Sequence, residues 1–118
     1  AAILICYDIE FPQHVRALKE QDVTLVFVPT ANPAGYEHVS KILVPARSSE
    51  MALTIAYANY CGSENGLGFA GYSLIVGPDG KPLVMSGTSE ALLITTTTND
   101  CNSEFLSSQL SDYRNLSQ

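Results

Sequence analysis

Residues 2–28 read AILICYDIEFPQHVRALKEQDVTLVFV, and this order of apolar and polar side chains predicts a strand, a helix and a second strand. The apolar run at 2–7 is typical of a strand that is covered on both faces. Segment 12–20 opens with a proline, which suits the first turn of a helix, and its apolar residues repeat at helical spacing. The run at 24–28 predicts a second buried strand, which Pro29 ends. The whole stretch is therefore expected to form a β-α-β unit with parallel strands and a right-handed crossover.

The rest of the chain predicts helices, strands and turns in a mixed order. They are a loop at 30–37, a helix at 38–52 that Pro45 kinks or breaks, a strand at 53–60, a glycine-rich loop at 61–71, hairpin strands at 72–76 and 81–85, a strand at 90–98 and a terminal helix at 103–115. The hairpin turn contains a proline, which presets φ, and Gly80, which adopts a positive φ. Ser103 is a suitable N-cap for the last helix. We expect an α/β fold (α+β layered) that forms one domain.

The composition excludes several classes of protein. The chain has 118 residues, of which 46% are hydrophobic, so it is expected to form a core rather than remain disordered. Its 12 acidic and 6 basic side chains are spread along the chain without a basic cluster, which argues against nucleic acid as a partner. No apolar run reaches the length of a membrane span, so no membrane partner is expected.

The cysteines and histidines give little support to a metal site or a disulfide framework. Cys6, Cys61 and Cys101 are odd in number and lack the spacing of a zinc site. His14 and His38 stand far apart in the sequence. We therefore expect no metal and no cofactor, and a reducing, cytoplasmic location.

Cys6 is the strongest candidate for chemistry, because it ends a predicted strand just before a helix. A thiol at such a position can be activated by nearby backbone N–H groups, although free cysteines also pack as small buried hydrophobes. Thr30 and Asn32 follow the second predicted strand, so they are expected at the same edge of the sheet. An unrelated thiol hydrolase with His14 as its base is an alternative, but a solvated helix histidine is the better interpretation of that residue.

The chain resembles the nitrilase superfamily, the carbon–nitrogen hydrolases, and specifically its amidase-like branch. The similarity runs in order over residues 2–94 and is carried by the segments Ile5-Cys6-Tyr7-Asp8-Ile9-Glu10-Phe11-Pro12, Val28-Pro29-Thr30-Ala31-Asn32, Val44-Pro45-Ala46-Arg47 with Glu50, 56–64, Gly71-Tyr72-Ser73, Gly77-Pro78-Asp79-Gly80 and Glu90-Ala91-Leu92-Leu93. The resemblance implies the C-terminal portion of a four-layer αββα sandwich, so that 1–118 would be a partial carbon–nitrogen hydrolase domain. It also implies a small amide-type substrate and a homo-oligomeric full-length protein.

The resemblance also implies a Glu–Lys–Cys triad, in which the cysteine attacks an amide carbon and forms a thioester. Cys6 would be the nucleophile, and the backbone N–H of Tyr7 would donate to the oxyanion. The glutamate and the lysine precede the cysteine in this family, and neither Lys19 nor Lys41 matches the position of the catalytic lysine. We therefore expect these residues to be the C-terminal part of a longer enzyme. The alternative is a catalytically silent truncated or split chain that acts as a binding or assembly module.

The other polar residues near Cys6 allow both a structural and a functional interpretation. Glu10, Thr30 and Asn32 are candidates for substrate binding. For Glu10, an ion pair with Arg16 or Arg47 is the favoured interpretation, because an unpaired buried carboxylate is costly.

Three further expectations concern structure and solution behaviour. Asp8 is expected to accept hydrogen bonds from loop N–H groups, and Arg47 with Glu50 is expected to form a structural ion pair. We also expect the isolated chain to associate or to be poorly soluble, because a two-layer half of the sandwich leaves one sheet face bare.

Overall fold

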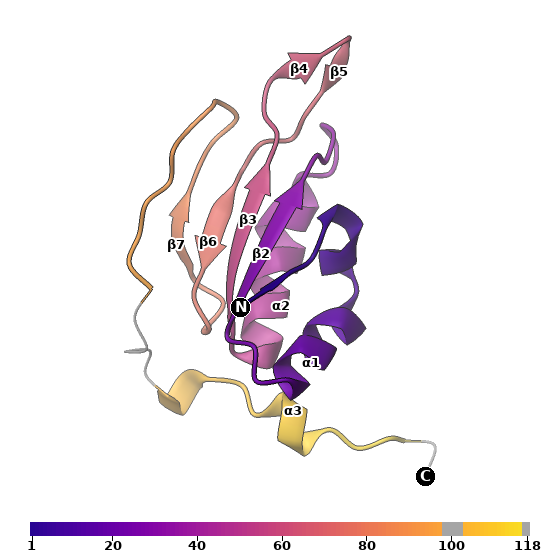
Figure 1. Ribbon diagram of the computed structural model, residues 1–118, viewed down its shortest axis with the longest axis vertical. Helices are drawn as coiled ribbons and strands as arrows, with labels where there is room; N and C mark the ends of the chain where they lie inside the picture. Colours follow the sequence, from indigo (N-terminus) through magenta and orange to yellow (C-terminus); the bar gives the residue numbers. More distant parts are fainter. Residues whose placement is uncertain (98–102, 117–118) are drawn as a thin grey trace.

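The computed structural model describes residues 1–97 and 103–116, and over these residues it contains a five-stranded mixed sheet with the strand order β1-β2-β3-β6-β7 (Figure 1). The strands are β1 (Ala2–Ile3), β2 (Leu25–Thr30), β3 (Thr54–Asn59), β6 (Leu74–Val76) and β7 (Pro82–Met85). The first three strands run parallel, and β6 and β7 are antiparallel to their neighbours. The predicted β-α-β unit and the mixed α/β class are confirmed.

The helical elements of the described residues alternate with these strands or follow them. They are η1 (Cys6–Glu10, a 3₁₀ helix), α1 (Pro12–Glu20), η2 (Val39–Leu43, a π-helical turn), α2 (Val44–Met51), η3 (Ser103–Phe105, a 3₁₀ turn) and α3 (Gln109–Asp112). Helices α1 and α2 lie on the same side of the sheet, and α3 lies against their lower ends (Figure 1). None of the helices in the described ranges is long and apolar enough to cross a membrane.

The core lies between the sheet and these helices. Alternate residues of the central strands point toward it, so that Val26 and Val28 of β2 are buried beside Ile55 and Tyr57 of β3. The helical side contributes a matching set of buried apolar residues: Ile9, Val15, Val39, Val44 and Met51. One face of the sheet is therefore packed as in an ordinary two-layer domain.

The opposite face of the sheet is open, which corrects the expectation that the first strand is covered on both faces. The strand register places one apolar residue of each strand directly opposite the next: Ile3, Phe27, Ala56, Ile75 and Val84. Ile3 is 66% exposed and Phe27 is 44% exposed. A shallow hollow of about 430 Å³ lies on this face. The sheet and its helices thus supply two of the four layers that the resemblance implies.

Strand β2 continues through Pro29, which the sequence had placed at its end. The carbonyl of Phe27 accepts a hydrogen bond from the N–H of Leu4, so the backbone polar groups of Phe27 point toward β1. Those of Pro29, two residues further along the strand, point to the same side. Because β1 is paired with β2 only as far as Ile3, no neighbouring strand needs an N–H from Pro29. The short first strand therefore explains why a proline is tolerated inside β2.

The predicted helix at 38–52 is confirmed with a break before Pro45. The N–H of Val44 donates to the carbonyl of Val39, five residues earlier, so the chain makes a π-helical turn before α2 starts. A π-turn adds one residue to the helix, and α2 then begins with Pro45 in its first turn, where a proline removes no internal hydrogen bond. Ala52 then adopts a left-handed conformation and ends α2.

The predictions for the middle of the chain are confirmed, with one addition. Strand β3 falls within 53–60, and β6 and β7 form the predicted hairpin, with Gly80 at a φ of +81° in its turn. The glycine-rich segment at 61–71 contains a small hairpin of β4 (Ser63–Glu64) and β5 (Leu67–Gly68) that projects beyond the sheet (Figure 1). Glycines at its turn therefore form a hairpin rather than an irregular loop.

The predictions for the last quarter of the chain are wrong where the structure describes it. Residues 90–97 form no strand, and Leu92 and Ile94 are exposed while Leu93 lies at the open sheet face; residue 98 and Cys101 lie outside the described residues. The terminal helix is reduced to η3 and α3. Serine side chains explain this, because the hydroxyl of Ser107 accepts a hydrogen bond from the N–H of Gln109 and favours a turn over a continuous helix.

Candidate active site at the end of β1

The backbone at Cys6 makes a sharp change of direction. Ile5 is extended, whereas Cys6 has a φ of +50°, in the left-handed region that residues with a side chain rarely occupy. The N–H of Ile5 donates to the carboxylate of Asp8 over 3.1 Å, so the predicted role of Asp8 as an acceptor for a loop N–H is confirmed. Left-handed residues that their surroundings hold in place are frequent at functional sites.

Thr30 lies beside this thiol, as its position at the end of β2 predicted. Its hydroxyl donates a hydrogen bond to Sγ of Cys6 over 3.1 Å, and the threonine is only 7% exposed. The structure thus brings together the ends of two parallel strands that are 24 residues apart in the sequence.

Asn32 is a buried structural residue as well as a neighbour of the site. Its side-chain amide donates to the hydroxyl of Tyr57 over 2.7 Å, and its backbone N–H donates to the side chain of Asn59 over 2.8 Å. Asn59 in turn donates to the carbonyl of Gly71 over 3.0 Å. These bonds tie the segments around Asn32 and Gly71 to the end of β3 and hold Asn32 in one orientation.

Tyr57 belongs to this network, although the sequence analysis did not select it. Burial raises the pKa of its phenol, while hydrogen bonds from Asn32 and Thr30 act in the opposite direction. The negative charges of Cys6 and Glu10 raise this pKa further. The period of two in β3 places Tyr57 and Asn59 on one face, and this was the signal from which Tyr57 could have been found.

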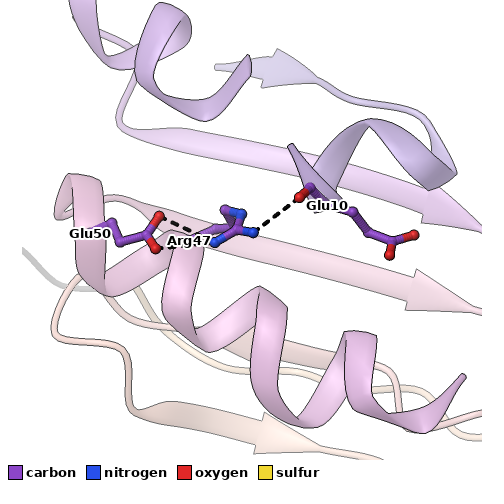
Figure 2. A network of polar contacts seen from close by, with 3 residues as sticks. All are labelled: Glu10, Arg47 and Glu50. Atoms are coloured by element: carbon purple, nitrogen blue, oxygen red, sulfur yellow. Dashed lines mark hydrogen bonds and ion pairs between the residues drawn. The ribbon is translucent and has the colours of Figure 1, made fainter. Parts of the chain in front are cut away.

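The expected ion pair between Glu10 and a nearby arginine is wrong. Arg47 donates to the backbone carbonyl of Glu10 over 3.0 Å, while the carboxylate of Glu10 points away from it (Figure 2). Arg16 pairs instead with Glu20. Arg47 is occupied by Glu50 over 3.1 Å, so the predicted structural pair of these two residues is confirmed. In the part of the chain that the structure describes, no ion pair involves the Glu10 carboxylate.

The backbone N–H of Tyr7 directly follows Cys6 in the chain. Among the described residues, no hydrogen bond takes up its N–H, which stands in the first turn of η1. Its ring packs on that of Phe11 at 4.9 Å between centroids and is largely exposed. An N–H next to the thiol with no internal acceptor is available to an oxyanion.

The histidine alternative gains no support from the structure. His14 is exposed and packs against the ring of Phe11 at 5.5 Å, and within the described ranges it makes no hydrogen bond to Cys6. Cys6 and Cys61 are free thiols. In residues 1–97 and 103–116, no three histidine, cysteine or acidic side chains gather as a metal site would require.

Fold and site together define a mixed α/β layered protein with a thiol and polar side chains at the carboxyl ends of its parallel strands. The chain belongs to the carbon–nitrogen hydrolase family, whose model matches residues 1–103. Among curated relatives, it is 45% identical over 93 residues to a hydrolase in the pqqF 5′ region of Pseudomonas protegens and 38% identical over 89 residues to an (R)-stereoselective amidase of a Pseudomonas species. These alignments cover 79% and 75% of this chain.

Solved structures of amidases show the same fold. The NitN amidase of Nesterenkonia sp. AN1 matches with a TM-score of 0.79 and 44% identity, over 86% of this chain and 42% of that one. A variant of the Nesterenkonia amidase with the acetamide moiety of fluoroacetamide covalently added at its active-site cysteine matches with a TM-score of 0.70 and 50% identity, over 73% of this chain and 33% of that one. The chain spans about a third of the length of the curated relatives, with 33% of the first and 32% of the second covered.

Proposed function

We propose that the polypeptide to which these residues belong is an amidase that hydrolyses a small amide or carbamoyl C–N bond, with Cys6 as its nucleophile. The observation that carries this proposal is the place of Cys6, which stands in a left-handed turn at the end of β1 beside the Thr30 hydroxyl. The similar Nesterenkonia amidase takes up a covalent acetamide moiety at its active-site cysteine, which supports the same role for Cys6.

The proposed reaction has two halves. The sulfur of Cys6 attacks the carbonyl carbon of the amide, a C–S bond forms, and the oxyanion accepts a hydrogen bond from the N–H of Tyr7. The C–N bond then breaks, and the amine leaves with a proton and yields a thioester on Cys6. Water attacks the thioester, the C–S bond breaks, and the carboxylate product and the free thiol are released.

The proton transfers need a general base, and the resemblance implies a glutamate and a lysine for this purpose. Neither Lys19 nor Lys41, both on helices after Cys6, stands at a matching position. We assign the glutamate and the lysine to parts of the polypeptide outside these 118 residues. This agrees with the share of the relatives that the chain covers.

The substrate is proposed to be a small amide. Complexes of the Nesterenkonia amidase contain acrylamide or butyramide, and this supports short acyl groups here. Glu10, Thr30 and Asn32 are the proposed substrate neighbours. The carboxylate of Glu10 has no ion-pair partner in the described ranges, so it is free to accept a hydrogen bond from an amide N–H of the substrate.

The proposal also includes a cellular location and an oligomeric state. The free thiols of Cys6 and Cys61 agree with a reducing, cytoplasmic location. The bare apolar face of the sheet agrees with a protein in which further layers cover it and whose full-length form is a homo-oligomer.

The test is the release of ammonia from acetamide, butyramide and acrylamide by the complete polypeptide that contains these residues. Cys6→Ala is expected to abolish the release, whereas Cys61→Ala, which removes the other described free thiol, retains it. A rate that survives in Cys6→Ala contradicts the proposed nucleophile. A folded wild-type polypeptide that releases no ammonia from any of these amides instead favours the silent binding module.

A further inference from the structure

We propose that Thr30 is a positioning residue for the Cys6 thiol, and that the buried contacts around it at the ends of β2 and β3 keep its hydroxyl directed at the sulfur. This inference rests on the proposed function, because it assumes that Cys6 is the reacting thiol. It concerns what prepares the sulfur for attack, and it draws on residues of β2 and β3 rather than on the loop that carries Cys6.

Thr30 contacts the Cys6 thiol directly. The Thr30 hydroxyl lies 3.1 Å from Sγ of Cys6, and Thr30 is buried at the end of β2. A hydrogen bond donated to sulfur favours the thiolate over the thiol, and the thiolate is the nucleophile. A branched side chain on a strand also has few rotamers, so its hydroxyl remains directed at the sulfur.

Behind Thr30, buried polar side chains fill the edge of the sheet. Tyr57, which is buried on β3, accepts a hydrogen bond from the Asn32 amide over 2.7 Å. The Thr30 hydroxyl has one proton, and the hydrogen bond that it donates runs to Sγ of Cys6. Because its neighbours are buried and bonded to one another, the Thr30 side chain has little freedom to turn away from the sulfur.

The register of the central strands holds this edge in place. Asn59 of β3 stands directly opposite Thr30 of β2, and its side chain accepts a hydrogen bond from the N–H of Asn32. Thr30 and Asn59 therefore belong to two adjacent central strands, whereas Cys6 begins the short 3₁₀ helix η1. The nucleophile thus receives its alignment from the sheet.

The experiment measures alkylation of Cys6 by iodoacetamide across a range of pH in the complete polypeptide, with the modified peptides resolved by mass spectrometry. Thr30→Val keeps the shape but removes the hydroxyl. We expect it to slow the alkylation of Cys6 at neutral pH about three- to tenfold. Thr30→Ser, which keeps a hydroxyl, should recover most of the rate, and Tyr57→Phe, which leaves the Thr30 hydroxyl in place, should slow it less.

Two controls separate positioning from general damage. Alkylation of Cys61 in the same samples reports loss of structure, and Thr24→Val removes an exposed threonine hydroxyl away from the site. An unchanged rate of Cys6 alkylation in Thr30→Val contradicts the proposal. If Thr30→Val does not fold, Thr30→Ser decides: a Cys6 rate close to that of the wild type supports the proposal, and a rate far below it with unchanged alkylation of Cys61 contradicts it.

The outcome for this inference is distinguishable from that for the proposed function. If ammonia release requires Cys6 but Cys6 is alkylated at the wild-type rate in Thr30→Val, only the positioning role fails. If Cys6→Ala still hydrolyses amides, the proposed function fails, whether or not Thr30→Val shifts the alkylation of Cys6.

Discussion

The guanidinium of Arg47 donates a hydrogen bond to the backbone carbonyl of Glu10 over 3.0 Å, and this contact joins α2 to the end of the turn that carries Cys6 (Figure 2). The same guanidinium bonds both oxygens of Glu50, over 3.1 and 3.3 Å. Arg47 therefore connects one helix with the segment that sets the position of the thiol. A planar group with donors in several directions suits this arrangement, and a lysine does not.

Arg47→Lys is expected to lower the free energy of unfolding by about 1–3 kcal/mol, because a single ammonium cannot satisfy both Glu50 and the Glu10 carbonyl in a buried position. Urea unfolding measures the loss. Glu20→Gln is the control, because it breaks the exposed Arg16–Glu20 pair and should cost less than about 0.5 kcal/mol. Losses of equal size in the two variants would contradict the conclusion that Arg47 stabilises the connection between α2 and the turn that carries Cys6.

Gly80→Ala is expected to destabilise the protein more than a positive φ alone requires. A Cβ at this position would lie 2.8 Å from the Cβ of Ser49 and 3.2 Å from the carbonyl oxygen of Pro45, so the hairpin turn would be pushed from α2. We expect a loss of about 2–3 kcal/mol by urea unfolding. Gly66→Ala, at a φ of +80° in open space, should lose only about 1 kcal/mol, and a similar loss in both would show that packing against α2 is unimportant.

The stability of the protein should fall at alkaline pH because of Tyr57. Its pKa is raised in the folded state by burial, so the folded protein holds the phenol proton more tightly than the unfolded chain does. The stabilisation is present below the unfolded value of 10.0 and is lost as the pH rises from there toward the folded pKa. Melting temperatures between about pH 9 and about pH 11 should decline less steeply in Tyr57→Phe than in the wild type. Parallel declines would contradict this.

The open sheet face should make the 118-residue chain associate. Phe27→Lys places a charge in the middle of the exposed apolar row and is expected to increase the monomeric fraction in size-exclusion chromatography with light scattering. Val28→Lys, one residue along on the buried face, should unfold the chain. A wild-type chain that is already monomeric at high concentration would contradict the expected association.

The parts of the fold that could be predicted are those set by short-range patterns. The β-α-β unit, α1 and the β6–β7 hairpin follow from periodicity and turn residues, and the structure contains all three. The length of β2 could not be predicted, because whether a proline is tolerated at Pro29 depends on where the neighbouring strand β1 ends. The open face of β1 could not be predicted either, because an apolar run does not indicate which elements pack against each face of a strand.

The site residues at the ends of strands could be predicted from the sequence, but most of their hydrogen-bond partners could not. Cys6, Thr30 and Asn32 lie together because parallel strands bring their carboxyl ends to one edge. The Glu10 carboxylate was predicted to pair with Arg16 or Arg47, but Arg47 binds the backbone carbonyl of Glu10 instead, since side-chain identity does not indicate which backbone groups need a donor. Tyr57 was missed because its contact with Asn32 needs the register of two strands.

The measurement that tests the central claim most directly is the location of the adduct that fluoroacetamide forms with the complete polypeptide. The sulfur of an activated cysteine displaces fluoride, so that a C–S bond forms and the C–F bond breaks. Peptide mass spectrometry is expected to place the acetamide moiety on Cys6, with Cys61 unmodified under the same conditions. An adduct on Cys61, or equal modification of both thiols, would contradict the assignment of Cys6 as the nucleophile.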